Sequence, residues 1–148
     1  LIGGDGRDYL QGGTRRDFLD GGAGRDRLIG RSFEDTLIGG EGNDRLNGGG
    51  DDDRLEGGAG RDVVKGGAGA DTFVFDIGCE VDRVRDFDIA QDRLEISAAL
   101  AGGRDAVAIE ALATVTAQGV EIDFGNGDGI DLRGLTETTG LAGQIDIV

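Results

Sequence analysis

The sequence predicts an all-β protein in which a repeated region of very short strands precedes a region of ordinary strands. Two observations support this prediction. A nine-residue repeat runs without insertion from Gly3 to Val74, and apolar and polar residues alternate after it. The chain of 148 residues contains 31 glycines and no proline. This is too much glycine for an ordinary packed globule, and the three-residue period of collagen is absent. We therefore expect one elongated domain or two small modules built from repeats.

Three columns of the repeat stay in phase through all eight units. Glycine begins every unit, Asp fills the sixth place, and a large apolar residue fills the eighth. The sixth-place residues are Asp8, Asp17, Asp26, Asp35, Asp44, Asp53, Asp62 and Asp71, and the eighth-place residues are Leu10, Leu19, Leu28, Leu37, Leu46, Leu55, Val64 and Phe73.

Each column has a physical reason. Glycines allow backbone conformations with φ > 0 and a tight turn whose carbonyl groups point toward one spot. The Asp adds a carboxylate there, and calcium takes about six to eight oxygen ligands of this mixed kind. One apolar residue between two outward-facing residues is typical of a very short strand. Each unit is therefore predicted to be a turn followed by a strand.

The unit GGAGRDRLI (21–29) resembles the nonapeptide of the RTX (repeats-in-toxin, hemolysin-type) calcium-binding family, and the resemblance covers residues 3–74. It implies a right-handed parallel β-roll of about four coils, with two units in each coil. The turns would stack along two edges, and several calcium ions (Ca²⁺) would lie between the turns of successive coils. The predicted organisation is a roll over residues 1–75 and a C-terminal β cap over residues 76–148.

The two edges of such a roll are expected to bind calcium unequally. Odd-numbered units keep every glycine, whereas three even-numbered units replace the fourth-place glycine with Arg15, Phe33 and Asp51. A side chain at a place that requires φ > 0 costs about 1–2 kcal/mol. Calcium should therefore fill the odd-numbered edge and, on the other edge, only the gap between Asp53 and Asp71. The predicted metal ligands are Gly3, Gly4, Asp5, Gly6, Asp8, Gly21, Gly22, Ala23, Gly24, Asp26, Gly39, Gly40, Glu41, Gly42, Asp44, Gly57, Gly58, Ala59, Gly60, Asp62, Asp53 and Asp71.

At the remaining even-numbered turns we expect no ion. There, Arg15 or Arg31 would supply positive charge near Asp17 and Asp35, and Asp35 would bond to backbone amides within its own turn.

The second half of the chain shows strand-like alternation in residues 82–97 and a hairpin pattern in residues 120–134. The ending GQIDIV predicts another short strand, and residues 98–113 fit either a short helix or a loop. This half resembles the C-terminal segment of serralysin-type secreted proteins. That resemblance implies an antiparallel, β-sandwich-like cap and an uncleaved signal for a type I (ABC transporter) secretion apparatus. The last three residues, Asp146-Ile147-Val148, fit the acidic and then apolar ending of such signals.

Charge and composition restrict the partners. Thirty Asp and Glu residues against fifteen Lys and Arg give a formal charge of −15, which disfavours nucleic acid and anionic membranes. So many carboxylates predict disorder unless a cation neutralises them. No apolar run of spanning length exists, and the first residues do not resemble a signal peptide. The single Cys79 and the absence of His leave no internal disulfide and no ordinary zinc site.

Three functions remain open. The preferred one is a secreted, extracellular module that folds on extracellular calcium and supports type I secretion and folding of a larger protein. The second is the accessory tail of a secreted enzyme, such as a serralysin-type protease, a lipase or an alginate-modifying enzyme. No catalytic motif is present, so an effector domain would lie upstream of Leu1. The third is an adhesin or carbohydrate-binding module in which Arg7, Arg16, Arg25 and Arg61 bind an acidic polysaccharide on one face.

Overall fold

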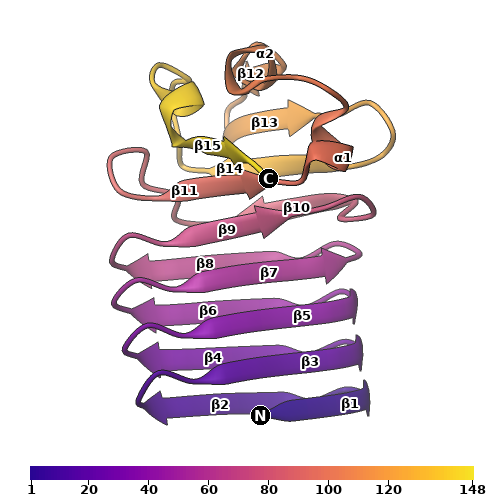
Figure 1. Ribbon diagram of the computed structural model, residues 1–148, viewed down its shortest axis with the longest axis vertical. Helices are drawn as coiled ribbons and strands as arrows, with labels where there is room; N and C mark the ends of the chain where they lie inside the picture. Colours follow the sequence, from indigo (N-terminus) through magenta and orange to yellow (C-terminus); the bar gives the residue numbers. More distant parts are fainter.

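The chain forms two parallel stacks of strands, joined alternately at two edges into a flattened rod (Figure 1). The structure is a computed structural model that describes residues 1–148. Sheet A contains, in spatial order, β1 (Ile2–Gly6), β3 (Phe18–Gly24), β5 (Thr36–Gly42), β7 (Arg54–Ala59), β9 (Thr72–Phe75), β11 (Arg93–Ile96) and β15 (Ile145–Ile147). Sheet B contains β2 (Tyr9–Thr14), β4 (Arg27–Ser32), β6 (Arg45–Gly50), β8 (Val63–Ala68), β10 (Val81–Val84), β14 (Gly129–Arg133), β13 (Gly119–Asp123) and β12 (Ala113–Val115).

The register of the stacked strands follows the repeat. Leu19 pairs with Leu37 in sheet A, and Leu28 pairs with Leu46 in sheet B, so that equivalent places of alternate units lie one above the other. The eighth-place side chains point between the sheets, and all of them are buried except the half-buried Leu10 of the first coil. A parallel β-roll with two units in each coil is therefore confirmed.

The roll is about one coil longer than the nonapeptides alone predict. Strands β10 and β11 continue the parallel ladders past residue 75, because Val84 pairs with Val64 and Leu94 pairs with Phe73. The loops that lead into these two strands have no nonapeptide glycine pattern, so counting nonapeptides misses this fifth coil. Strand β15 then adds a further parallel neighbour to β11.

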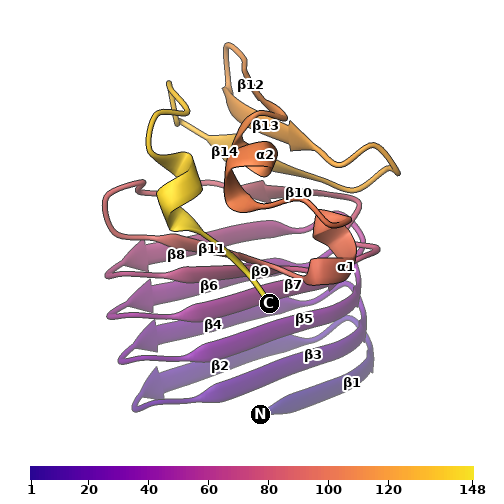
Figure 2. The same cartoon turned by 45° about the horizontal axis from the view of Figure 1, so that its top comes forward.

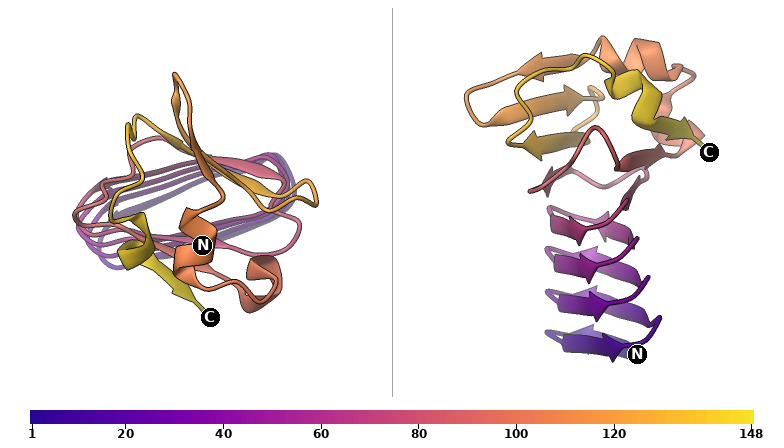
Figure 3. Two further views of the ribbon diagram at one scale, coloured as in Figure 1. Left: turned by 90° about the horizontal axis from the view of Figure 1, so that it is seen from above. Right: turned by 90° about the vertical axis from the view of Figure 1, so that its left-hand side faces the viewer.

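Antiparallel strands cover the top of the roll, as predicted, and the hairpin expected over residues 120–134 is present as β13 and β14. These strands, together with β12, extend sheet B through β10 (Figure 2). The stretch 98–113 contains two short helices, α1 (Ala98–Ala101) and α2 (Ala106–Glu110). A single 3-10 turn, η1 (Leu141–Gln144), precedes β15. The cap is broader than the rod beneath it, as the side view in Figure 3 shows.

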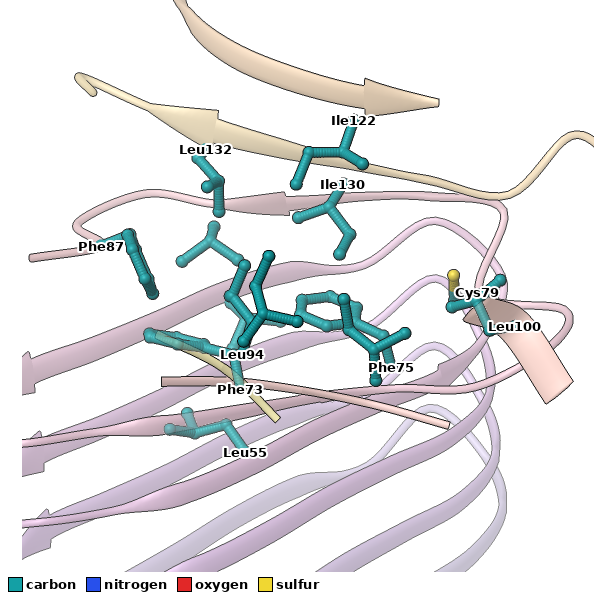
Figure 4. Packing of buried hydrophobic residues seen from close by; sticks show 14 of the residues in the cluster. Leu55, Phe73, Phe75, Cys79, Phe87, Leu94, Leu100, Ile122, Ile130 and Leu132 are labelled. Atoms are coloured by element: carbon teal, nitrogen blue, oxygen red, sulfur yellow. The ribbon is translucent and has the colours of Figure 1, made fainter. Parts of the chain in front are cut away.

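One apolar core runs from the roll into the cap. In Figure 4, Leu55, Phe73 and Leu94 follow one another upward in sheet A, and Ile130 and Leu132 approach from β14. The rings of Phe73 and Phe87 lie 6.1 Å apart at a tilt of 55°, a favourable aromatic arrangement. Cys79 is buried in the same cluster, where burial raises the pKa of its thiol to about 12. None of the helices is long or apolar enough to cross a membrane.

Candidate calcium-binding turns

The sixth-place Asp residues form two vertical ladders, one at each edge of the roll. From the second coil onward, the Oδ1 atom of each Asp accepts a hydrogen bond from the backbone amide of the Asp one coil earlier. The amide of Asp26, for example, donates to Asp44, and the amide of Asp35 donates to Asp53, at 2.7 and 2.8 Å. The prediction that Asp35 bonds within its own turn is therefore wrong. Because the turns stack closely, the nearest free amide belongs to the coil below.

The second oxygen of these carboxylates has no partner. The Oδ2 atoms of Asp26, Asp44 and Asp62 on one edge, and of Asp35 and Asp53 on the other, are buried without a hydrogen bond. Burying an ionised carboxylate without a partner is costly, and buried polar atoms are normally satisfied. These turns therefore contain rows of oxygen atoms that lack a counter-charge.

Burial also changes the acidity of the ladders. Removal from water, reinforced by neighbouring carboxylates, raises the pKa of Asp44 and Asp62 to about 6 and that of Asp53 to about 7. The bonded backbone amide lowers each pKa, but by less than burial raises it. The protein by itself therefore opposes full ionisation of the ladders at neutral pH, and a nearby cation would reverse this effect.

Backbone carbonyl groups lie close to the orphaned oxygens. A Cβ atom on Gly21 would lie 2.7 Å from Oδ2 of Asp26 and 2.5 Å from the carbonyl oxygen of Gly39, which belongs to the next coil. A carboxylate of one turn and a carbonyl of the adjacent turn thus face the same small space. No group of three or more acidic, His or Cys side chains converges on one point. A cation held here would depend on mixed carboxylate and carbonyl oxygens, which is the donor set that calcium accepts.

The odd edge, made of the turns 3–8, 21–26, 39–44 and 57–62, holds most of the predicted ligands together. The second-place glycines Gly22 and Gly40 have φ of 98° and 106°, and the fourth-place Gly24 and Gly42 have φ of 144° and 123°. A Cβ at Gly24 or Gly42 would overlap the carbonyl oxygen of the glycine one coil below. Glycine is therefore required on this edge by both backbone conformation and stacking.

The even edge is made of the turns 12–17, 30–35, 48–53 and 66–71, and two of these, 30–35 and 48–53, take up the same conformation with side chains present. Phe33 and Asp51 occupy the fourth place with φ of 73° and 72°, and Arg31 occupies a second place with φ of 95°. The expectation that the fourth place has φ > 0 is confirmed for Phe33 and Asp51. Arg15 is not among the residues with positive φ. The carboxylate of Asp51 supports this edge by accepting from the amide of Phe33 at 2.9 Å.

The arginines near the even edge do not neutralise its Asp ladder. Arg31 donates to the side-chain amide oxygen of Gln11, and Arg16 forms an ion pair with Glu34. Neither Arg15 nor Arg31 forms an ion pair with Asp17 or Asp35. The prediction that these arginines replace calcium there is therefore wrong.

Sequence reasoning missed two members of the ladders and one residue of the cap. Asp82 accepts from the amide of Asp62 at 2.8 Å, and Asp92 accepts from the amide of Asp71 at 2.9 Å. Their signal is the spacing Asp82-x-Val84 and Asp92-x-Leu94, which repeats the sixth and eighth places of a unit. In the cap, Asp128 accepts from the amides of Gly78 and Glu80 and so joins the β13–β14 turn to the fifth coil.

These features define the class of the protein: a calcium-binding parallel β-roll. The family model for the RTX calcium-binding nonapeptide repeat (4 copies) matches residues 2–37, 29–64 and 47–78, and the chain belongs to this family. Its repeats form a calcium-binding module that is not itself catalytic. No curated protein sequence matches the chain.

Two solved structures are similar to it. The AlgE6R3 subunit of the mannuronan C5-epimerase of Azotobacter vinelandii is 30% identical, with a TM-score of 0.61; the match covers 99% of this chain and 81% of that one. The extracellular lipase LipA of Serratia marcescens is 16% identical, with a TM-score of 0.52, and shares the fold. The match covers 99% of this chain and 39% of the lipase. The similar structures thus come from two enzymes, an epimerase and an extracellular lipase.

Proposed function

We propose that this chain is a module of a secreted protein that folds when it meets extracellular calcium and thereby supports type I secretion and folding of that protein. The observation that carries the proposal is the row of buried carboxylate oxygens without partners at the edges of the roll. The family membership and the likeness to a domain of a secreted enzyme support it.

The physical basis is linkage between binding and folding. An ion that binds only the folded chain stabilises it in proportion to RT ln(1 + [Ca²⁺]/Kd). Extracellular calcium sites have Kd values of about 10⁻⁴ to 10⁻³ M, so cytosolic calcium would leave them empty and extracellular calcium would fill them. With a formal charge of −15, the calcium-free chain repels itself and stays open.

The proposed ions lie mainly on the odd edge, in the gaps from Asp8 to Asp26, Asp26 to Asp44, and Asp44 to Asp62. There the glycine carbonyls of the turns supply the remaining ligands. The orphaned Oδ2 of Asp82 adds the gap from Asp62 to Asp82 as a further candidate. On the even edge we propose only the gap from Asp53 to Asp71.

We further propose that residues 76–148 complete the roll with its fifth coil, cap it with the strands that follow, and contain the secretion signal. A repeat stack exposes an apolar end unless a terminal element covers it, and β14 covers the top of sheet B here. The acidic and apolar ending lies in β15 and just beyond it, where Asp146 pairs with Arg93 at 3.2 Å.

The proposal is tested by titrating the chain with calcium while recording far-ultraviolet circular dichroism. We expect little fixed structure in chelator and a cooperative rise of β signal at millimolar calcium. Magnesium should fail, because it demands a small octahedral shell and keeps its water ligands. Identical spectra in chelator and in calcium would disprove calcium-driven folding.

A role as the accessory module of an enzyme is a second candidate, because both similar structures come from enzymes. A catalytic domain would then lie outside these residues. Expressing the longer parent protein with and without this module, and assaying its activity in calcium, would distinguish an accessory role from a secretion role alone.

A further inference from the structure

The turn between β13 and β14 contains the dipeptide Asn126-Gly127, and the same dipeptide occurs once more in the chain, as Asn47-Gly48 in β6. Asn is one of the thermally labile residues. When Gly follows it, the amide nitrogen of the Gly can approach the side-chain carbonyl carbon closely, because Gly has no side chain in the way. The two dipeptides share this chemistry, so any difference in their reactivity comes from the fold.

The dipeptide in the cap is exposed and free of packing. Asn126 and Gly127 both lie on the surface, in a loop that projects from the side of the cap (Figure 2). The amide of Gly127 donates no hydrogen bond to the protein. A Cβ atom on Gly125 or on Gly127 would have no other atom within 4 Å. The attacking nitrogen is therefore free, and the turn has room to change its conformation.

The side chain of Asn126 is already folded toward this nitrogen. The amide of Asp128 donates to Oδ1 of Asn126 at 3.3 Å. Because Asp128 lies two residues further along the chain, this bond bends the Asn126 side chain back over the peptide bond between Asn126 and Gly127. The same bond polarises the side-chain carbonyl group and stabilises the negative charge that develops on Oδ1 when a nitrogen adds to the carbon.

The dipeptide in the roll is held in the opposite way. Strand β6 lies between β4 and β8, where Asn47 pairs with Ile29 on one side and with Lys65 on the other. Gly48 is buried, and a Cβ atom on it would overlap Oδ2 of Asp53. A strand fixed on both sides cannot bend into the ring that the attack requires. Asn47 can react only after the roll opens locally, and such opening costs free energy.

We propose that Asn126 is a site of spontaneous deamidation in the folded protein, and that the reaction loosens the cap from the fifth coil. The amide nitrogen of Gly127 loses its proton and forms a bond to Cγ of Asn126. The bond from Cγ to the side-chain nitrogen then breaks, and this nitrogen takes up a proton and leaves as ammonia. Water opens the resulting succinimide ring at either carbonyl group. The product carries a carboxylate at position 126, in aspartate or isoaspartate linkage, and water is the only other reactant.

The position of the turn gives the reaction a consequence. Asp128 joins this turn to the fifth coil by accepting from the amides of Gly78 and Glu80 at 3.3 and 3.0 Å. Both products add a negative charge close to Asp123 and Asp128, neither of which forms an ion pair. In the isoaspartate product the main chain also passes through the side chain and gains one carbon atom. The turn therefore shifts, and the bonds of Asp128 weaken.

The first test compares the two dipeptides in the full chain, folded in calcium as verified by circular dichroism. The protein is incubated at mildly alkaline pH in water enriched in heavy oxygen, then digested and analysed by mass spectrometry. Heavy oxygen enters only when a succinimide opens during the incubation. We expect label at position 126 to appear about tenfold faster than at position 47, or more. In urea, where the fold is lost, the two positions should react at comparable rates. Equal rates in the folded protein, or no label at position 126, would overturn the proposal.

The second test concerns the cap. Asn126→Gln is the matched control, because it keeps a side-chain amide but has to close a larger and slower-forming ring. After the same incubation in calcium, amide hydrogen exchange at Gly78 and Glu80 should be severalfold faster in the parent protein than before it. The variant, incubated in parallel, should show no change. Unchanged exchange in the incubated parent, or equal acceleration in the variant, would refute the effect on the cap.

Discussion

The two edges of the roll are built from the same nine-residue unit but use it differently. On the odd edge, a Cβ at the fourth-place glycine of the second, third or fourth coil, which is Gly24, Gly42 or Gly60, would overlap the carbonyl one coil below. On the even edge, Phe33 and Asp51 occupy the same place and keep the left-handed conformation. Both edges retain the buried Asp ladder and the buried apolar residue. The comparison separates two demands: the ladder and the core need Asp and a large apolar residue in every unit, whereas the fourth place is always glycine on the odd edge and admits Phe33 and Asp51 on the even edge.

The largest expected effect comes from placing a methyl group at the same place on the two edges. Gly24→Ala combines an unfavourable φ with overlap of the Gly6 carbonyl. It should lower the free energy of unfolding by roughly 3 kcal/mol in saturating calcium. Asp51→Ala loses only an exposed hydrogen bond and should cost about 1 kcal/mol. Thermal or urea unfolding measures both values, and equal losses would remove the distinction between the edges.

The next effect concerns calcium. Asp26→Asn and Asp35→Asn both keep an Oδ1 acceptor for the amide below, but each removes one carboxylate charge. If ions occupy the odd edge, Asp26→Asn should raise the calcium concentration at the folding midpoint severalfold, and Asp35→Asn should change it little. Asp20→Asn, on the outer face of sheet A, controls for net charge. Calcium titration by circular dichroism decides the matter, and a larger shift for Asp35→Asn would reverse the assignment of edges.

Acidification should stabilise the fold in the absence of calcium and destabilise it in limiting calcium. The pKa values of Asp44, Asp62 and Asp71 are raised to about 6 and that of Asp53 to about 7. The calcium-free fold therefore prefers these groups protonated, and it loses stability as pH rises from about 4 through 6–7. In chelator, β signal should increase as pH falls from 8 to 5. In limiting calcium it should decrease, because protons compete for the ligands.

Individual members of the ladders should contribute unequally to this response. The pKa of Asp53 is raised to about 7 and that of Asp62 to about 6, so Asp53→Asn should abolish more of the change between pH 8 and pH 6 than Asp62→Asn does. A chelated chain whose stability is constant from pH 8 to pH 5 would contradict the whole scheme.

The smallest expected effect is relief of strain on the even edge. Phe33 is exposed and has a φ of 73°, so Phe33→Gly should stabilise the folded state by about 1 kcal/mol. Gly50→Ala, at an open place of the same edge, is the matched control because only one atom lies within 4 Å of its Cβ. If calcium also binds at Asp35 in the Phe33→Gly variant, the lack of glycine at this place is what excludes the ion from the turn in the parent protein.

The repeated half of the fold could be predicted because its columns recur every nine residues. Coil number, the two edges and the positive φ of Phe33 and Asp51 follow from that period, except for the fifth coil. Its strands keep the Asp-x-Val and Asp-x-Leu spacing, but their turns differ in length, so that hydrogen-bonded Asp pairs are 20 and 21 residues apart instead of 18.

The basic outer face of sheet B, with Arg27, Arg45, Lys65 and Arg83, could not be predicted for a different reason. Its residues stand at outward-facing places whose residue type varies from unit to unit, and they become neighbours only when alternate units stack. The direction of the hydrogen bonds in the Asp ladder, from each amide to the carboxylate of the following coil, could not be predicted either. It depends on which amide lies nearest to a carboxylate after the coils have packed.

That ladder gives the rod a polarity. The amide of each sixth-place Asp is bonded by the coil that follows it in the chain, and the series ends at Asp82 and Asp92. Detaching the first coil would release carboxylate oxygens that water solvates readily. Detaching the last would break the bonds from the amides of Asp62 and Asp71 and expose the apolar core that this coil shares with the cap. The stack should therefore fray from its N-terminal end and zip up toward it, so that order spreads against the direction of synthesis.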